Sequence, residues 1–315
     1  MSWLAVGLGL VLAVGGIGWS IAQANSGLQP WDPELADNVV FAKSLPLIIG
    51  FGILTGFARA LAYRRRTEQR ADGAIRRFRP ATALNHWINA LGFLLAMVTG
   101  SIQYLKGVLD FSALVPLFWI YRVHFVGASV MVYAAAVFVT YRLMIADHRL
   151  LPQRGQWIRD LRGLVHELPR PLGGVLALVL GLDRKRQPPP AEQFTFYEKV
   201  VSFPIWMVLL ALILITGFLK AMRYIFPIPG EVLWWASALH VGAMVLLAAK
   251  FLDHLRYVLG PSRWPLLKSM VTTWIDEHYV RRRHPAWYQA IQAERGGAAL
   301  TGARAITATP EGAGE

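Results

Sequence analysis

Two histidines mark the ends of one apolar run, HVGAMVLLAAKFLDH, which extends from His240 to His254. They are 14 residues apart, so on a helix the second ring is turned by about 40° from the first and lies about 21 Å further along the axis. Imidazole is costly inside a bilayer and is a common metal ligand. One helix face therefore offers an iron ligand near each membrane surface. The alternative is two helix-end histidines, each bonded to a carbonyl or to interfacial water.

The composition predicts that this helix belongs to a protein with several membrane spans. Hydrophobic residues make up 55% of the 315 residues, and the mean hydropathy is +0.40. These values are too apolar for an ordinary soluble domain. Most of the hydrophobic runs approach the roughly 20 residues that a spanning helix needs. Six runs result, at Trp3–Ile21, Leu45–Tyr63, Trp87–Gly100, Phe118–Tyr141, Val200–Met222 and Val232–Leu252.

The first run has two interpretations. Residues 1–24 form either a spanning helix or a signal peptide, because Ala22-Gln23-Ala24 resembles a small-residue cleavage site. The basic region that should begin a signal peptide is missing. We therefore favour an uncleaved helix.

The basic residues lie in blocks between the apolar runs. They give the chain a net charge of +13, but they are not interleaved with aromatic residues on a soluble face, so we expect no nucleic-acid partner. The positive-inside rule places the blocks in the cytoplasm. All six runs then alternate without conflict, as in a multi-pass protein of the bacterial inner membrane. The three blocks are residues 64–79, residues 147–199 and the tail after Arg281.

This topology supplies each histidine of the opening run with a partner at its own depth. His86 follows a basic block and lies near the cytoplasmic surface, as His254 does. His124 follows the outer connection 101–117 and lies near the outer surface, as His240 does. Depth alone pairs His86 with His254 and His124 with His240, which predicts two haem irons with two histidine ligands each.

The absence of cysteine and the positions of four glycines bear on which cofactor the chain could hold. The chain has no cysteine, which excludes an iron–sulfur cluster, a covalently attached haem, a disulfide and a thiol redox centre within it. Gly92, Gly127, Gly217 and Gly242 would let a flat macrocycle approach the backbone, although glycine is also frequent in ordinary helix packing.

The inner loop 143–199 contains an apolar stretch, residues 172–182, that is too short to span. We expect an interfacial helix there. The loop ends in hydroxyl and charged groups that are either snorkelling anchors or a quinone headgroup site. These are Thr195, Tyr197, Glu198 and Lys199.

The remaining histidines fall outside the spans. We expect His148 and His166 of the inner loop to be solvated, and His278 and His284 of the tail to ligate nothing.

In this order and topology, the motifs resemble those of the cytochrome b, or gamma, subunit of membrane-bound formate dehydrogenases. The resemblance covers about residues 76–294. The spacing of His240 and His254, together with the tail motif HPAWY, is fairly specific. The matching motifs are His86-Trp87 followed by Thr99-Gly100, His124, Lys199 followed by Thr216-Gly217, His240 with His254, and His284-Pro285-Ala286-Trp287-Tyr288.

The resemblance implies a four-helix haem-binding bundle, and the hydrophobic runs add two N-terminal transmembrane helices, so we expect an all-α integral membrane protein. We divide the chain into residues 1–80 with these two helices and a basic loop, a core at 81–260 with a cytoplasmic loop at 143–199, and a cytoplasmic tail at 261–315 whose end we expect to be disordered.

The implied function is electron relay rather than catalysis. Two b-type haems, ligated by His86 with His254 and by His124 with His240, would pass electrons from an extracytoplasmic iron–sulfur subunit to menaquinone or ubiquinone. That subunit would belong to a complex with a molybdenum catalytic subunit. Related b cytochromes serve hydrogenases, thiosulfate reductases and other molybdenum oxidoreductases, and these remain alternatives. A cofactor-free membrane scaffold or transporter with structural histidines is the alternative from another class.

Overall fold

The structure is a computed structural model that describes residues 33–63, 70–111, 114–147 and 149–294, with residues 11 and 15. The first hydrophobic run lies outside the described residues except for residues 11 and 15. His148 and the expected disordered end lie outside them entirely. The described chain divides into two compact units. Unit 1 comprises residues 33–63, 80–147 and 204–260, and unit 2 comprises residues 70–79, 149–203 and 261–294.

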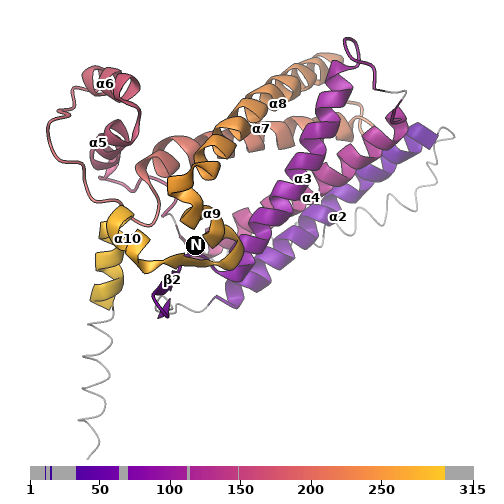
Figure 1. The fold of residues 1–315 in the computed structure, drawn as a ribbon. Helices are drawn as coiled ribbons and strands as arrows, with labels where there is room; N and C mark the ends of the chain where they lie inside the picture. Colours follow the sequence, from indigo (N-terminus) through magenta and orange to yellow (C-terminus); the bar gives the residue numbers. More distant parts are fainter. Residues whose placement is uncertain are drawn as a thin grey trace, which may run out of the picture. The chain divides into compact units, whose positions relative to one another are not determined.

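Unit 1 consists of long apolar helices. Within the described ranges, five helices are long and apolar enough to cross a membrane, which confirms the prediction of a helical multi-pass protein. The α7 span begins in the π-helical turn η1, Glu198–Ser202, and the whole span covers Glu198–Met222. The helices are α2 (Pro33–Leu61), α3 (Pro80–Leu105), α4 (Leu117–Ile145), α7 (Phe203–Met222) and α8 (Gly230–Leu259), shown in Figure 1.

Four of these helices contribute to one apolar core. Its buried side chains are Phe93 of α3, Met131 of α4, Leu209 of α7 and Leu247 of α8. Because side chains from all four helices meet there, the core lies inside a four-helix arrangement.

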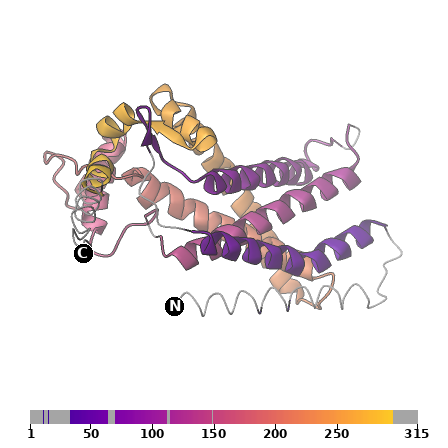
Figure 2. The ribbon, with the colours of Figure 1, turned by 90° about the horizontal axis from the view of Figure 1, so that it is seen from below.

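Helix α2 packs against α4, and the two run alongside each other in both ribbon views (Figures 1 and 2). A Cβ added at Gly52 would come within 2.9 Å of the Tyr133 carbonyl oxygen, and one at Gly56 within 2.7 Å of the Val137 carbonyl oxygen. The missing side chains therefore allow the two backbones to approach closely.

Unit 2 is built around a small sheet with the order β1-β2-β3, comprising β1 (Arg70–Ala71), β2 (Ala74–Arg76) and β3 (Trp274–Asp276). Both pairings are antiparallel. The β1–β2 turn is Asp72-Gly73, with φ angles of 42° and 76°, the left-handed conformation that two-residue hairpins favour.

The helices of unit 2 are short. They are α5 (Trp157–Glu167), α6 (Arg170–Val179), the 3₁₀ turn η2 (Pro261–Arg263), α9 (Trp264–Thr272), α10 (Glu277–Arg283) and a helical segment at 285–294. Their apolar core with the sheet is formed by Ile75, Leu266, Ile275, Val280, Trp287 and Ile291.

Helix α6 occupies the stretch expected to form an interfacial helix. Its buried residues are the small Gly173 and Ala177, whereas Leu172, Val175 and Leu178 are exposed. One apolar face is therefore open, as an interfacial helix requires.

Unit 2 joins three segments that are distant in the chain. They are residues 70–79, 149–203 and 261–294, each of which includes part of a basic block. His284 is buried rather than part of a polar tail, whereas His278 is exposed.

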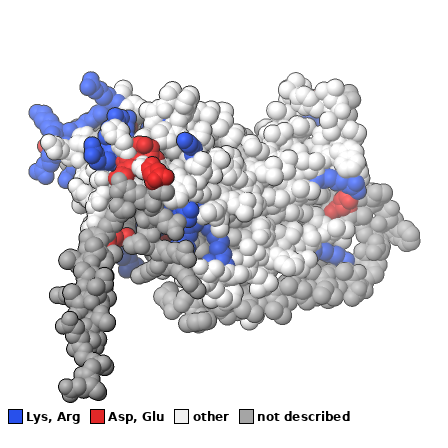
Figure 3. Space-filling view, turned by 60° about the horizontal axis from the view of Figure 1, so that its bottom comes forward, with Lys and Arg blue, Asp and Glu red and all other residues white. Residues whose placement is uncertain are grey.

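In Figure 3, the visible middle of the long helices carries almost no Lys, Arg, Asp or Glu atoms.

A substitution at the α3–α4 contact tests the close packing of unit 1. A Cβ at Gly127 would lie 2.7 Å from the Ala96 backbone nitrogen and 2.8 Å from the Gly92 carbonyl oxygen. Because backbone atoms cannot yield as flexible side chains do, we expect Gly127→Ala to cost roughly 1–3 kcal/mol of unfolding free energy.

Thermal unfolding of the purified protein in detergent measures this loss. Gly230→Ala is the matched control, because a Cβ there meets no atom within 4 Å. Equal unfolding temperatures for the two variants would contradict the close backbone contact.

Candidate functional site

The four sequence-predicted histidines are arranged as two pairs in unit 1. His86 lies near the beginning of α3 and His254 near the end of α8, and an electrostatic interaction links them. A second interaction links His124, near the beginning of α4, to His240 on α8. All four side chains are half-buried. The structure thus brings together the pairs that depth alone predicted, while their roles as ligands stay a prediction.

The ring of His124 is held at Nδ1 by helix α3. Its Nδ1 lies 3.1 Å from the Ala96 carbonyl oxygen and 3.2 Å from the Thr99 hydroxyl oxygen. The Thr99 hydroxyl donates its own proton to the Leu95 carbonyl, at 2.5 Å, so it is free to accept. A carbonyl only accepts, so Nδ1 carries the proton and Nε2 keeps the lone pair that binds metals.

His240 repeats this arrangement on helix α7. The Thr216 hydroxyl lies 3.0 Å from His240 Nδ1 and donates to the Leu212 carbonyl at 2.7 Å. The Ile213 carbonyl is the backbone partner of His240. In both cases the carbonyl belongs to the residue three positions before the threonine. The two helix pairs therefore hold their imidazoles in the same tautomer.

A glycine follows each threonine and lies against the same ring. A Cβ added at Gly100 would come within 3.2 Å of His124 Cε1, and one at Gly217 within 3.2 Å of His240 Cε1. Glycine at these positions lets each imidazole lie close to the neighbouring helix.

The glycines singled out in the sequence have different surroundings. Gly92 and Gly127 face each other across the α3–α4 contact, the ordinary packing alternative, whereas Gly217 borders a histidine. A Cβ at Gly242 would meet no atom within 4 Å.

His86 and His254, the pair that the sequence predicts near the inner surface, have aromatic neighbours. The ring of His254 packs edge-on against Trp206, with centroids 6.0 Å apart, and Trp206 packs edge-on against Phe93 at 5.6 Å. The ring of His86 lies edge-on to its neighbour Trp87 at 5.5 Å. Aromatic side chains thus connect this end of the site to the four-helix core.

His124 and His240, the pair that the sequence predicts near the outer surface, fit a haem with two histidine ligands. The observation that tests the fit is the donor chemistry: two imidazoles in one locality, each with Nδ1 engaged on its neighbouring helix and Nε2 left with a lone pair. Such outer partners orient metal-binding histidines.

The predicted quinone-site residues have structural contacts in unit 2. Thr195 and Glu198 form a reciprocal capping box: the Thr195 N–H donates to Glu198 Oε2 at 2.8 Å, and the Glu198 N–H donates to Thr195 Oγ1 at 3.1 Å. The Tyr197 N–H donates to Glu167 Oε2 at 2.7 Å. Quinone binding by this segment stays a prediction, and its contacts show how the helix start is held.

Lys199 does not snorkel to a surface. Its side chain is 1% exposed, and its Nζ lies 3.0 Å from Asp160 Oδ2 and 3.2 Å from Glu192 Oε2. The side chain of Asp160 is 0% exposed. This is a buried ion pair, whose attraction must offset the desolvation of both charges.

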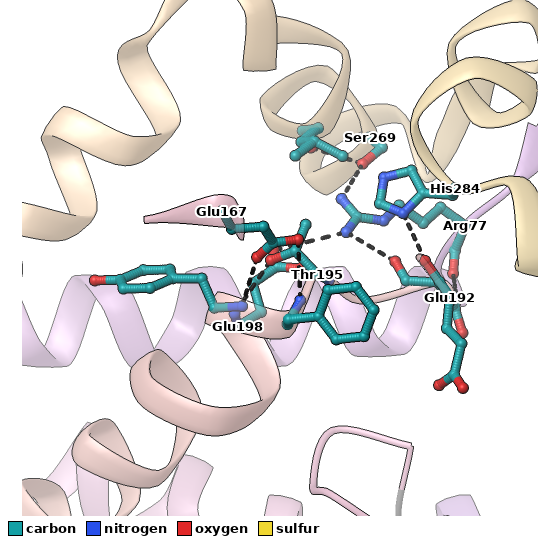
Figure 4. Close-up of polar contacts among 11 residues, drawn as sticks. Arg77, Glu167, Glu192, Thr195, Glu198, Ser269 and His284 are labelled. Atoms are coloured by element: carbon teal, nitrogen blue, oxygen red, sulfur yellow. Dashed lines mark hydrogen bonds and ion pairs between the residues drawn. The ribbon is translucent and has the colours of Figure 1, made fainter. Parts of the chain in front are cut away.

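A polar network continues from this segment through the rest of unit 2 (Figure 4). The buried Arg77 donates to Ser269 Oγ at 3.4 Å and lies 3.8 Å from Glu198 Oε1. His284 Nδ1 lies 2.6 Å from the Glu192 carbonyl oxygen. Buried polar groups therefore join the segments 70–79, 149–203 and 261–294 within one unit.

Glu167, Asp160 and Arg77 lie in segments that the sequence identifies only as basic blocks. The pattern Thr-Phe-Tyr-Glu at 195–198 is a capping-box signature, and it could have identified Thr195 and Glu198 as a helix start. Nothing in the sequence signals the long-range partners Glu167 and Asp160.

Replacement of Lys199 tests the buried ion pair. Lys199→Met leaves Asp160 as an uncompensated buried charge, so we expect a loss of about 3–5 kcal/mol in the stability of unit 2. Hydrogen exchange of residues 149–199 in the full-length protein measures this loss. Lys185→Met, at an exposed lysine, should leave exchange unchanged. Exchange that is equally slow in both variants would show that the pair contributes little.

A pH dependence follows from Glu167. Burial raises its pKa from 4.5 to about 6, although N–H groups of Tyr197 and Phe196 oppose the shift. The folded protein then retains a proton that the unfolded chain releases, so stability should fall between pH 4.5 and pH 6 and level off above. The loss should be small, because Glu167 is exposed and solvent screens its charge. Hydrogen exchange against pH measures it, and Glu167→Gln should abolish this slope. The same slope in both proteins would contradict the assignment.

A family model described as prokaryotic cytochrome b561 matches residues 77–273. No curated protein matches the chain.

Proposed function

We propose a function from the premise that this chain belongs to the prokaryotic cytochrome b561 family. It is accordingly a multi-pass protein of the bacterial inner membrane and a b-type cytochrome of electron transfer. Within that role, we propose that it holds two b-type haems, through His86 with His254 and through His124 with His240. We further propose that it relays electrons between an extracytoplasmic donor and membrane quinone.

The repeated arrangement at the outer histidines carries this proposal. His124 and His240 each have a threonine hydroxyl within 3.2 Å of Nδ1, a backbone carbonyl partner and a glycine beside the ring. A helix-end histidine would need a single acceptor. Two identical arrangements on different helix pairs are better explained by a shared ligand between Nε2 atoms.

The chain's own residues orient and shield the reacting groups. Nδ1–H bonds fix the two outer rings, and Trp206 packs against His254 at the inner end. A b-type haem held by two histidines would supply one-electron oxidation and reduction and would not bind a substrate at its iron. The buried core between the two histidine pairs excludes water from the region that separates them.

We propose that the donor is an iron–sulfur subunit of formate dehydrogenase type, accompanied by a molybdenum catalytic subunit. The connections at the outer end support a protein partner because they expose large apolar side chains. Val108 is 83% and Leu114 79% exposed, and Trp234 and Trp235 are exposed at the beginning of α8. A hydrogenase or thiosulfate reductase subunit could use the same surface, so the donor needs its own test.

The proposed quinone end is the beginning of the Glu198–Met222 span, with Thr195, Tyr197, Glu198 and Lys199. Quinone reduction consumes protons, and this segment is bordered by Glu167, whose pKa burial raises to about 6. A carboxyl with that pKa exchanges protons near neutral pH. This chemistry supports the location, and either menaquinone or ubiquinone satisfies it.

The visible spectrum of the reduced protein tests the haem proposal. We expect a b-type absorption with two haems per chain, and each single alanine variant of His86, His124, His240 or His254 should lose about half of it. His278→Ala is the control because that histidine is exposed. Absence of b-type absorption, or full haem content in all four variants, would refute the proposal.

The donor is tested separately in membranes that contain the native complex. Formate should reduce the b-type haem within the mixing time, hydrogen should not reduce it, and thiosulfate should not reoxidise the reduced haem. Reduction by hydrogen alone would assign the cytochrome to a hydrogenase instead.

A further inference from the structure

Lys220 is a basic side chain near the outer histidines that the proposed electron relay has not used. It follows Thr216 by four residues and Gly217 by three, so all three share one face of α7. That face is the one that contacts His240, because the Thr216 hydroxyl lies 3.0 Å from His240 Nδ1. Electrostatic interactions link Lys220 to both His124 and His240. The ammonium group is therefore close to both members of the outer pair.

No carboxylate of the described chain pairs with this ammonium group. Asp37 on α2 is already engaged, since its two carboxylate oxygens accept from Arg122 at 2.6 and 3.1 Å. Lys220 is half-buried within an apolar span. A cation in this position is costly unless an anion accompanies it or its chain reaches water.

We propose that Lys220 binds a carboxylate of the group held between His124 and His240. The proposal rests on the proposed function, because a haem carries two propionate carboxylates on its rim. Lys220 lies about one helical turn beyond Thr216, that is, about 6 Å further toward the outer end of α7. An ammonium group there, close to both imidazoles, would bind a carboxylate of the group that they hold. Lys220 is thus a cofactor-binding residue and ligates no metal.

Arg223 provides a matched comparison on the same segment. It is exposed, it donates to the Tyr224 hydroxyl at 2.6 Å, and its guanidinium lies 4.8 Å from the Tyr224 ring centroid. Its charge already has a local partner. Removal of this charge changes the net charge of the outer end by the same amount as removal of Lys220 does.

The test compares Lys220→Met, Lys220→Arg and Arg223→Met in the purified holoprotein. We expect Lys220→Met to lower the midpoint potential of one haem only, because loss of a nearby cation disfavours the added electron. We also expect it to weaken retention of that haem about tenfold in a transfer assay with apomyoglobin, the loss expected for one charge-assisted bond. Lys220→Arg should restore both properties, and Arg223→Met should leave both unchanged.

Two results would overturn the proposal. One is a Lys220→Met protein with the potential and haem retention of Arg223→Met, which would show that the lysine only reaches toward water. The other is a loss of both haems together with a lowered unfolding temperature, which would show a folding role. His240→Ala separates these failures from failure of the proposed function: if it keeps both haems, no haem is held there and the haem proposal itself is wrong.

Discussion

An imidazole inside a membrane span needs a partner for each of its two nitrogens, and this constraint explains much of unit 1. In His124 and His240 one of the two nitrogens, Nδ1, has its partners in the same way: it faces a carbonyl and a threonine hydroxyl of the preceding helix. The contact requires the two helices to approach closely at that level. Gly100 and Gly217 make the approach feasible, because a Cβ at either would come within 3.2 Å of the ring. The remaining nitrogen, Nε2, is then directed by the helix pair rather than by the histidine alone.

The apolar core lies midway between the two levels of histidines. Phe93 follows His86 by seven residues, Met131 follows His124 by seven, and Leu247 follows His240 by seven. Leu209 precedes Thr216 by the same number. Seven helical residues rise about 10.5 Å, so one dry layer separates two polar levels about 20 Å apart. The same seven-residue spacing on the four helices therefore relates the apolar core to both levels of histidines.

Much of unit 1 could be predicted from the sequence, because its signals are local in the chain. The apolar runs indicated the spans, and the basic blocks indicated depth, which was enough to pair His86 with His254. The Thr-Gly pairs were visible as motifs, but their contact with Nδ1 depends on helix rotation, which the sequence does not determine. For the same reason the sequence does not distinguish the packing glycines Gly92 and Gly127 from Gly217, which borders a histidine.

Unit 2 could not be predicted in the same way, because three distant segments form it. The Asp72-Gly73 turn and the Thr-Phe-Tyr-Glu motif at 195–198 are recognisable local signals. However, nothing local indicates that Ile75 pairs with Ile275, that Lys199 pairs with Asp160, or that His284 is buried. The sequence predicts only basic loops for these segments, because a charged residue does not reveal its long-range partner.

A cryo-electron-microscopy map of the purified protein tests the central claim most directly. We predict two haems, one with its iron between Nε2 of His124 and Nε2 of His240, and the other between His86 and His254. The Nδ1 atoms of the outer pair should face the Ala96 and Ile213 carbonyl oxygens. An iron bound through Nδ1, a haem shared between the two levels, or histidine pairs with no haem between them would contradict the account.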